Sequence, residues 1–324
     1  MGARFRLTAG ALVMGAALCT GAAAGRVVGP TAHRAAHPRS LAPPASDASD
    51  ADTSAASAAA ADPHAAHRAG SAGGPAAEGT PAGTAGATEG LLATAAGYTL
   101  TAESTLVDGL AGTPFRFRIT DPAGAVVHDY AVAHERPLHL VVVARDLAVY
   151  HHLHPLLGPD GAWAVPLPAL TPGAYRAVAD FTVAGGPALT LGVDLFVPGG
   201  ALYSPLPPPS GLVAVHGYDV SLTGAPALRE GGEVALTVAT GGEPVTDLEP
   251  YLGASGHLVV IRSSDLAFVH VHPAGDEAAA AAGPTVRFHV AVSAPGDYRM
   301  FFEFAHVGVV HVAPFTVRVP PPPP

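Results

Sequence analysis

His139-Leu-Val-Val-Val-Ala-Arg-Asp-Leu-Ala-Val-Tyr-His-His-Leu-His-Pro155 returns later in the chain as His257-Leu-Val-Val-Ile-Arg-Ser-Ser-Asp-Leu-Ala-Phe-Val-His-Val-His-Pro273. In each copy, a first histidine is followed by two more, 13 and 15 residues further along. Between them lie an apolar run rich in β-branched residues, an Asp-Leu-Ala turn and a second short run, which is the pattern of a β-hairpin. The turn slips by one position between the copies, whereas the histidine spacing does not change. The repeat therefore predicts an all-β chain with a duplicated unit.

The hairpin also predicts that the three histidines of each copy converge. The last two are two positions apart, so they share one face of a strand. A turn centred on Asp146-Leu147, or on Ser264-Asp265 in the second copy, sets the first histidine opposite the last, with Cβ atoms about 4.5–5.5 Å apart. Three imidazoles at such distances are typical of a metal site. The expected ligands are His139, His152 and His154 in the first copy, and His257, His270 and His272 in the second.

The repeat extends beyond the hairpin to two whole domains. Short runs rich in Val, Phe and Tyr, separated by Gly, Pro or Asp, predict seven strands in each domain. We expect two tandem immunoglobulin-like or cupredoxin-like antiparallel β-sandwiches, one over residues 96–199 and one over 213–319. The expected strands are 98–107, 114–120, 138–144, 148–154, 162–167, 174–183 and 188–197, and then 218–222, 233–240, 257–262, 267–272, 285–292, 297–306 and 309–318.

The remaining segments predict an exported protein. Residues 1–24 carry two arginines, an apolar run and small residues, which is the pattern of a secretory signal peptide, with an uncleaved N-terminal anchor as the alternative. Residues 25–95 are rich in Ala, Pro and Ser without apolar periodicity, which predicts a disordered spacer. Residues 200–212 predict a Pro-rich linker, and 320–324 a Pro tail. The expected location is secreted or in the extracytoplasmic cell envelope.

Composition excludes several functions. The net charge is −10 and all 16 basic residues are Arg, without a basic patch, which argues against nucleic-acid binding and against a polybasic lipid-binding surface. The single cysteine, Cys19, lies in the leader, so the exported chain has no thiol for a disulfide, a cysteine-ligated zinc site or a blue-copper centre.

A second shared motif predicts a structural role for two tyrosines. Pro172-Gly-Ala-Tyr-Arg176 returns as Pro295-Gly-Asp-Tyr-Arg299, each leading into a late strand. A tyrosine just after a Gly turn at the start of such a strand is typical of the tyrosine corner of immunoglobulin-like sandwiches. We therefore expect Tyr175 and Tyr298 to anchor the fold rather than to act in catalysis.

Further residues could complete the metal sites. Asp180 and Glu303 are candidate fourth ligands, although Arg176 and Arg299 lie four residues earlier, so a surface ion pair explains the carboxylates equally well. The apolar residues on both faces of 140–143 and 258–261 indicate that another surface covers each hairpin. The other candidate ligands are His134 beside the first hairpin, and His306 and His311 in the second domain.

Imidazole ligands with a carboxylate or water suit Cu(II), with Zn(II) as the alternative. Nucleophile elbows, Gly-rich phosphate loops and His-Glu-x-x-His motifs are all missing from the sequence, which predicts a protein that is not an enzyme. A copper-dependent oxidase or superoxide-type activity stays open, since an open coordination position is all that it requires.

The motifs His-Leu-Val-Val, His-x-His-Pro and Pro-Gly-x-Tyr-Arg resemble those of largely uncharacterised actinobacterial secreted or envelope proteins with tandem β-sandwich modules. More loosely, the chain is similar to cupredoxin-like copper-handling proteins. It departs from them in having no cysteine and only Met300 after the leader. This argues against electron transfer and leaves copper binding or buffering. The alternative is a structural or protein-interaction module of the envelope with structural histidines. The expected partners are a metal ion and another envelope protein.

Overall fold

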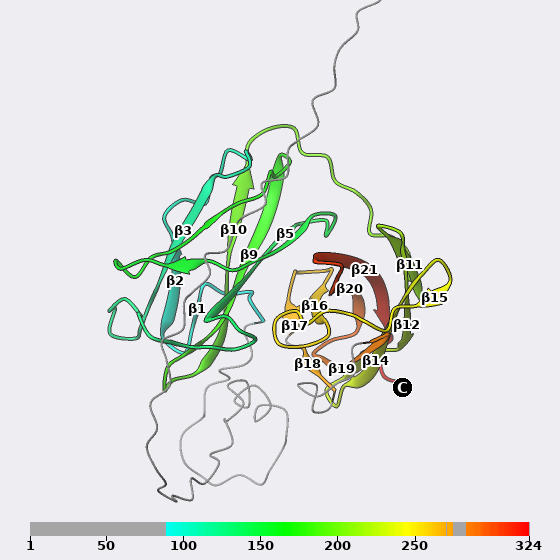
Figure 1. The fold of residues 1–324 in the computed structure, drawn as a ribbon. Helices are drawn as coiled ribbons and strands as arrows, with labels where there is room; N and C mark the ends of the chain where they lie inside the picture. The colour runs from blue at the N-terminus through cyan, green and yellow to red at the C-terminus, as the bar shows by residue number, and fades with distance from the viewer. Residues whose placement is uncertain (1–88, 270, 275–282, 324) are drawn as a thin grey trace, which may run out of the picture. The chain divides into compact units, whose positions relative to one another are not determined.

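The computed structural model describes residues 89–269, 271–274 and 283–323 (Figure 1). The predicted signal peptide, nearly all of the predicted spacer and His270 lie outside these ranges. The described residues form strands and connecting loops, and among them no helix is long and apolar enough to cross a membrane. The predicted all-β fold of two tandem sandwiches is confirmed.

The first sandwich consists of two sheets that face one another across a core (Figure 1). One sheet has the order β1-β2-β3-β8-β7 and the other the order β10-β9-β5-β6, with β4 added beside β9. The second of these is called the β5 sheet below. The strands are β1 (Thr94–Ala95), β2 (Tyr98–Ala102), β3 (Pro114–Thr120), β4 (Tyr130–Ala131), β5 (Leu138–Ala144), β6 (Tyr150–Leu153), β7 (Leu156–Leu157), β8 (Trp163–Pro166), β9 (Gly173–Val183) and β10 (Ala188–Val197).

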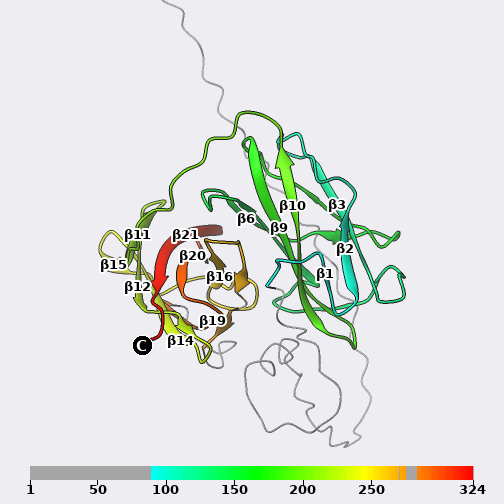
Figure 2. The ribbon, with the colours of Figure 1, turned by 180° about the vertical axis from the view of Figure 1, so that it is seen from behind.

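The second sandwich repeats this arrangement (Figure 2). One sheet has the order β11-β12-β14-β19-β13, with β15 and β18 at its margins, and the other, called the β16 sheet, has the order β17-β16-β20-β21. Pairing is antiparallel except between β13 and β19. The strands are β11 (Leu212–Val215), β12 (Tyr218–Gly224), β13 (Ala227–Leu228), β14 (Gly232–Thr240), β15 (Glu243–Pro244), β16 (His257–Arg262), β17 (Phe268–Val269), β18 (His272–Pro273), β19 (Thr285–Val292), β20 (Gly296–His306) and β21 (Val309–Val319).

Each sandwich has a core of its own, built by alternation along the strands. In β3 every second residue is buried, so that Phe115, Phe117 and Ile119 point inward while Arg116 and Arg118 point outward. Trp163 is fully buried in the same core. The second core is built in the same way around Phe288, Phe302, Phe304 and Phe315.

The two predicted tyrosine corners are present. The hydroxyl of Tyr175 donates to the carbonyl of Thr171 at 2.8 Å, and that of Tyr298 donates to the carbonyl of Ala294 at 2.6 Å. Both tyrosine side chains are otherwise buried, so the hydroxyl needs a partner and finds it four residues upstream. Each bond ties the turn to the strand that follows it.

The central hairpin strands, β5 and β16, are buried on both faces, as their apolar runs predict. One face of each belongs to the core of its own sandwich. The other faces pack against each other in a third apolar cluster, which we call the intersheet cluster. It comprises Val141, Val143, Leu147 and Val178 from the first sandwich, and Val259, Ile261, Leu266, Phe268 and Phe301 from the second.

Both hairpins have the predicted register, but the pairing of the second is shorter than predicted. Val141 pairs with His152 and Leu140 with Leu153, so the next step along the ladder brings His139 toward His154. In the second hairpin the pairing of β16 with β17 covers only Val260 with Val269 and Ile261 with Phe268. His272 pairs instead with His289 in the opposite sheet, so the predicted position of His272 across from His257 is wrong.

Candidate metal centre

His139, His152 and His154 converge as the spacing predicts. His139 lies on β5, His152 lies on β6, and His154 follows directly after β6. Each offers one ligand atom, and these atoms all lie within 4.8 Å of one another. The ring centroid of His139 lies 5.1 Å from that of His152 and 5.1 Å from that of His154. The hairpin register therefore suffices to assemble three imidazoles at one end of the β5 sheet.

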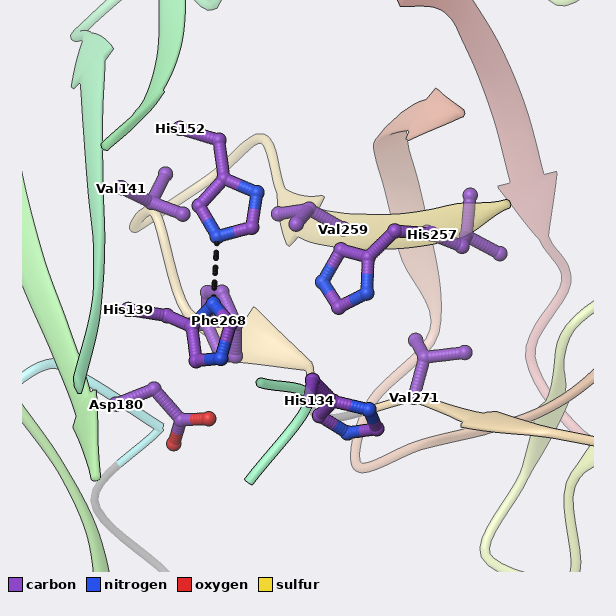
Figure 3. A pocket seen from close by; sticks show the side chains of 10 residues that line it. His134, His139, Val141, His152, Asp180, His257, Val259, Phe268 and Val271 are labelled. Atoms are coloured by element: carbon purple, nitrogen blue, oxygen red, sulfur yellow. Dashed lines mark hydrogen bonds between the residues drawn. The ribbon is translucent and has the colours of Figure 1, made fainter. Parts of the chain in front are cut away.

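A chain of hydrogen bonds fixes the orientation of two of these rings. Nε2 of His139 lies 3.0 Å from the carbonyl oxygen of Ala133, and because that oxygen can only accept, Nε2 carries the hydrogen. Nδ1 of neutral His139 then accepts from Nε2 of His152 at 3.0 Å (Figure 3). On its other side, Nδ1 of His152 lies 2.8 Å from Oε2 of Glu303, with one proton held between them. These hydrogen bonds therefore link the first sandwich to the second.

Burial keeps two of the imidazoles neutral. Desolvation, together with the neighbouring His152, lowers the pKa of His139 to about 4. Desolvation, with His152 and His139 nearby, lowers the pKa of His154 to about 3. Nε2 of His154 is buried and has no hydrogen-bond partner among the described residues. Neutral imidazoles with free lone pairs are the form that binds transition metals.

His257 joins this group from the second sandwich. Its ring lies 5.1 Å from that of His152 and 6.0 Å from that of His139, centroid to centroid. With His152 and Glu303 it forms a second group of three possible ligands, again within 4.8 Å of one another. The sequence predicts His257 in a separate site of its own domain, but the structure places it beside His139 and His152 (Figure 3). We call His134, His139, His152, His154 and His257 the histidine cluster.

The cluster has an internal symmetry that follows from the duplication. His139 on β5 pairs with Asp180 on β9, and His257 on β16 pairs with Glu303 on β20. Each sandwich therefore presents one histidine and one carboxylate from equivalent strands. Both carboxylates are buried, with Asp180 7% exposed and Glu303 2% exposed, so they favour a cation nearby.

Asp180 and Glu303 are not members of surface ion pairs with the preceding arginines. The guanidinium of Arg176 pairs with Asp194, and that of Arg299 donates to the hydroxyl of Thr316. Asp180 accepts a hydrogen bond from Thr190 at 2.8 Å and lines the pocket beside His139.

The remaining predicted ligands differ in where they lie relative to the pocket. His134 lies in a turn with φ of 48° and lines the pocket, with its ring 5.6 Å from that of His257. His306 and His311 lie with Tyr218 and His216 in the second sandwich rather than in this pocket. His270 and the side chain of His272 lie outside the described residues, so the second triplet stays a prediction.

Tyr150 is a residue of the site that sequence reasoning missed. Its hydroxyl donates to Oε1 of Glu303 at 3.0 Å, and its ring stacks on Phe301 with centroids 4.0 Å apart. Burial, and then the Glu303 carboxylate, hold the pKa of Tyr150 well above its usual value. Tyr150 and Glu303 are 153 residues apart, and only the packing of the two sheets brings them together.

Comparison with known families gives a match for the second sandwich. Residues 213–321 match the family described as "Domain of unknown function (DUF8832)". No curated protein matches the chain.

Among solved structures, the Escherichia coli adhesin FdeC is 16% identical, with 69% of this chain and 64% of that chain covered and a TM-score of 0.23. The fibronectin(III)-like modules of Clostridium thermocellum CbhA are 13% identical, with 68% and 93% covered and a TM-score of 0.19. Domains 5-6 of the S-layer protein SbsC are 15% identical, with 68% and 96% covered and a TM-score of 0.20. The chain spans less than two thirds of the adhesin. What is established is a tandem β-sandwich whose second half matches a family of unknown function.

Proposed function

We propose that this chain is an exported, non-catalytic binding protein whose histidine cluster takes up a divalent transition-metal ion, copper ahead of zinc. The observation that carries this proposal is the convergence of the His139, His152 and His154 ligand atoms within 4.8 Å of one another. Imidazole donors suit both metals, and Cu(II) binds more tightly than Zn(II) to a given set of nitrogen ligands.

The partners of the outer ring nitrogens support this proposal. Metal-bound histidines usually donate their other N–H to a backbone carbonyl or a carboxylate, which fixes the ring and its tautomer. His139 donates to the carbonyl of Ala133 in this way, and His152 has Glu303 on its far side. Two nitrogens that bind one tetrahedral ion lie about 3.3 Å apart, close to the 3.0 Å between His139 and His152. An ion beside this pair would replace the proton between them and would meet the unpartnered Nε2 of His154.

A second candidate is the structural or protein-interaction module of the envelope. The observation that favours it is the buried bridge from His152 and Tyr150 to Glu303, which joins the two sandwiches. In this case the histidines hold the sandwiches together, and binding of a protein partner occurs elsewhere on the surface.

Cu(II) titration of the full chain separates the two candidates. The background variant has the four histidines that precede the sandwiches changed to alanine, so that only later residues bind tightly; these are His33, His37, His64 and His67. We expect stoichiometric Cu(II) binding at neutral pH, measured by equilibrium dialysis. We expect it to be lost in the double variant His152→Ala/His154→Ala.

The matched control is His128→Ala, which changes an exposed histidine of the same sandwich. It should bind Cu(II) like the background. If the background binds no Cu(II), and the double variant only lowers the free energy of unfolding, the metal proposal is wrong and the structural candidate stands.

A further inference from the structure

His152 belongs to two different groups of possible metal ligands. The first group is His139, His152 and His154, and the second is His152, His257 and Glu303. They share His152 alone. All other members of the first group come from the first sandwich, and all other members of the second group come from the second sandwich.

Each ring nitrogen of His152 faces a member of one of these two groups. Nε2 lies 3.0 Å from Nδ1 of His139, and Nδ1 lies 2.8 Å from Oε2 of Glu303. The two nitrogens of an imidazole point away from each other in the plane of the ring, so the two groups lie on either side of it. Figure 3 shows His152 facing His139, with His257 beside the pair.

The duplication supplies each side with its own donors. His139 and His257 occupy equivalent positions on β5 and β16, and their strand partners Asp180 and Glu303 are equivalent carboxylates on β9 and β20. Two buried carboxylates among imidazoles favour positive charge on both sides of His152. A single ion at the first group would occupy only one of these two ligand groups.

The geometry points to a two-ion centre in which His152 bridges the ions, with Nε2 bound to the first and Nδ1 to the second. His139 and His154 complete the ligands of the first ion, and His257 and Glu303 those of the second. The bridging ring loses its N–H hydrogens to solvent as protons, and each nitrogen gives its lone pair to one ion. The class of ligand is a pair of divalent transition-metal ions, Cu(II) or Cu(II) with Zn(II). This inference rests on the proposed metal binding.

Copper stoichiometry and electron paramagnetic resonance of the full chain test the bridge. The same background is used, with histidines 33, 37, 64 and 67 changed to alanine. We expect two Cu(II) per chain by equilibrium dialysis. Because an imidazolate couples the spins of two Cu(II) ions antiferromagnetically, the integrated signal at low temperature should fall well below the bound copper. Loading one equivalent of Zn(II) before one of Cu(II) should restore the full signal of the bound copper.

Variants assign the two positions. Glu303→Gln keeps the shape of the side chain and should bind one Cu(II) with full signal intensity, and His154→Ala should weaken only the first position. His289→Ala, which changes an exposed histidine of the second sandwich, is the control and should behave like the background. Circular dichroism checks that each variant is folded.

Three other outcomes would each overturn a different part of the proposal. One Cu(II) per chain in both the background and Glu303→Gln overturns the second position but leaves the proposed function standing. Two Cu(II) with the full, uncoupled signal overturn the bridge. No bound Cu(II) overturns the proposed function itself, and the two-ion centre with it. The Zn(II)/Cu(II) loading needs no substitution in the cluster, so the test holds even if Glu303→Gln does not fold.

Discussion

At the residue scale, His152 is the side chain on which the site depends. Its side chain is buried, at 2% exposure, and both of its ring nitrogens have partners, one in each sandwich. The neighbouring His151, which has Val142 as its strand partner, takes no part in either ligand group. Adjacent strand residues point to opposite faces, so His152 faces the site whereas His151 faces the interior of the fold.

Tyr150→Phe should lower the free energy of unfolding by about 1.5–3 kcal/mol, because it removes the hydroxyl that donates to Oε1 of Glu303 and leaves the carboxylate short of one donor. The ring, and with it the stacking on Phe301, is retained. Urea denaturation of the metal-free chain measures the change. The control is Tyr203→Phe at an exposed position, which should have no effect. Equal stability of the two variants would contradict a role of the hydroxyl in joining the sandwiches.

The metal-free chain should lose stability as the pH falls from 6.5 toward about 4. The pKa values of His139 and His154 are lowered to about 4 and about 3, below the usual value of 6.5 for the unfolded chain. In this interval the unfolded state binds more protons than the folded state, so the free energy of unfolding decreases with decreasing pH. His139 faces His152, Asp180 and His134, and His154 faces His152, His139 and Arg136.

Urea denaturation at several pH values measures this slope. The double variant His139→Gln/His154→Gln, which cannot be protonated at these positions, should show a shallower slope than the parent. The same slope in both proteins would show that other groups cause the loss of stability.

At the element scale, the hairpins and tyrosine corners follow local rules. The expected strands 114–120, 138–144, 188–197, 257–262 and 285–292 coincide with β3, β5, β10, β16 and β19. Turn residues and alternation are local in sequence, so they can be read without the tertiary structure. The strand expected at 267–272 instead divides into β17 and β18, because the chain changes sheets between Val269 and His272.

Tyr175→Phe and Tyr298→Phe should each lower the free energy of unfolding by about 1 kcal/mol, since each removes one hydrogen bond to a backbone carbonyl and leaves that acceptor to find water. Neither change should alter Cu(II) binding, because both tyrosines lie away from the histidine cluster on their strands. Thermal and urea denaturation, together with Cu(II) titration, check both parts. A loss of Cu(II) binding in either variant would assign the corner a role in the site.

At the scale of the whole molecule, the intersheet cluster determines where the site forms. Val141 and Val143 pack against Val259 and Ile261, and this contact places β5 and β16 side by side. The histidines and carboxylates of the equivalent strands meet next to it. Neither sandwich contains both ligand groups, so the centre is a property of the pair.

Ile261→Glu should separate the two sandwiches, because it places an unpaired charge in a fully buried apolar position. Each sandwich keeps its own core, so calorimetry should resolve two thermal transitions, and the second copper position should be lost. Val309→Glu, at a position that is 53% exposed in the same sandwich, is the control and should leave both unchanged. Unaltered unfolding of Ile261→Glu would contradict the packing of the two sheets.

The sequence by itself determined the strands, the duplication, the tyrosine corners and the convergence of His139, His152 and His154, because each depends on alternation and register within a short stretch of chain. It also indicated that both faces of the central strands are covered. It did not determine what covers them, because apolar side chains of similar size fit many surfaces. Only the tertiary structure placed His257 and Glu303 beside His152. That contact joins residues 151 apart and depends on how two whole sheets pack against each other.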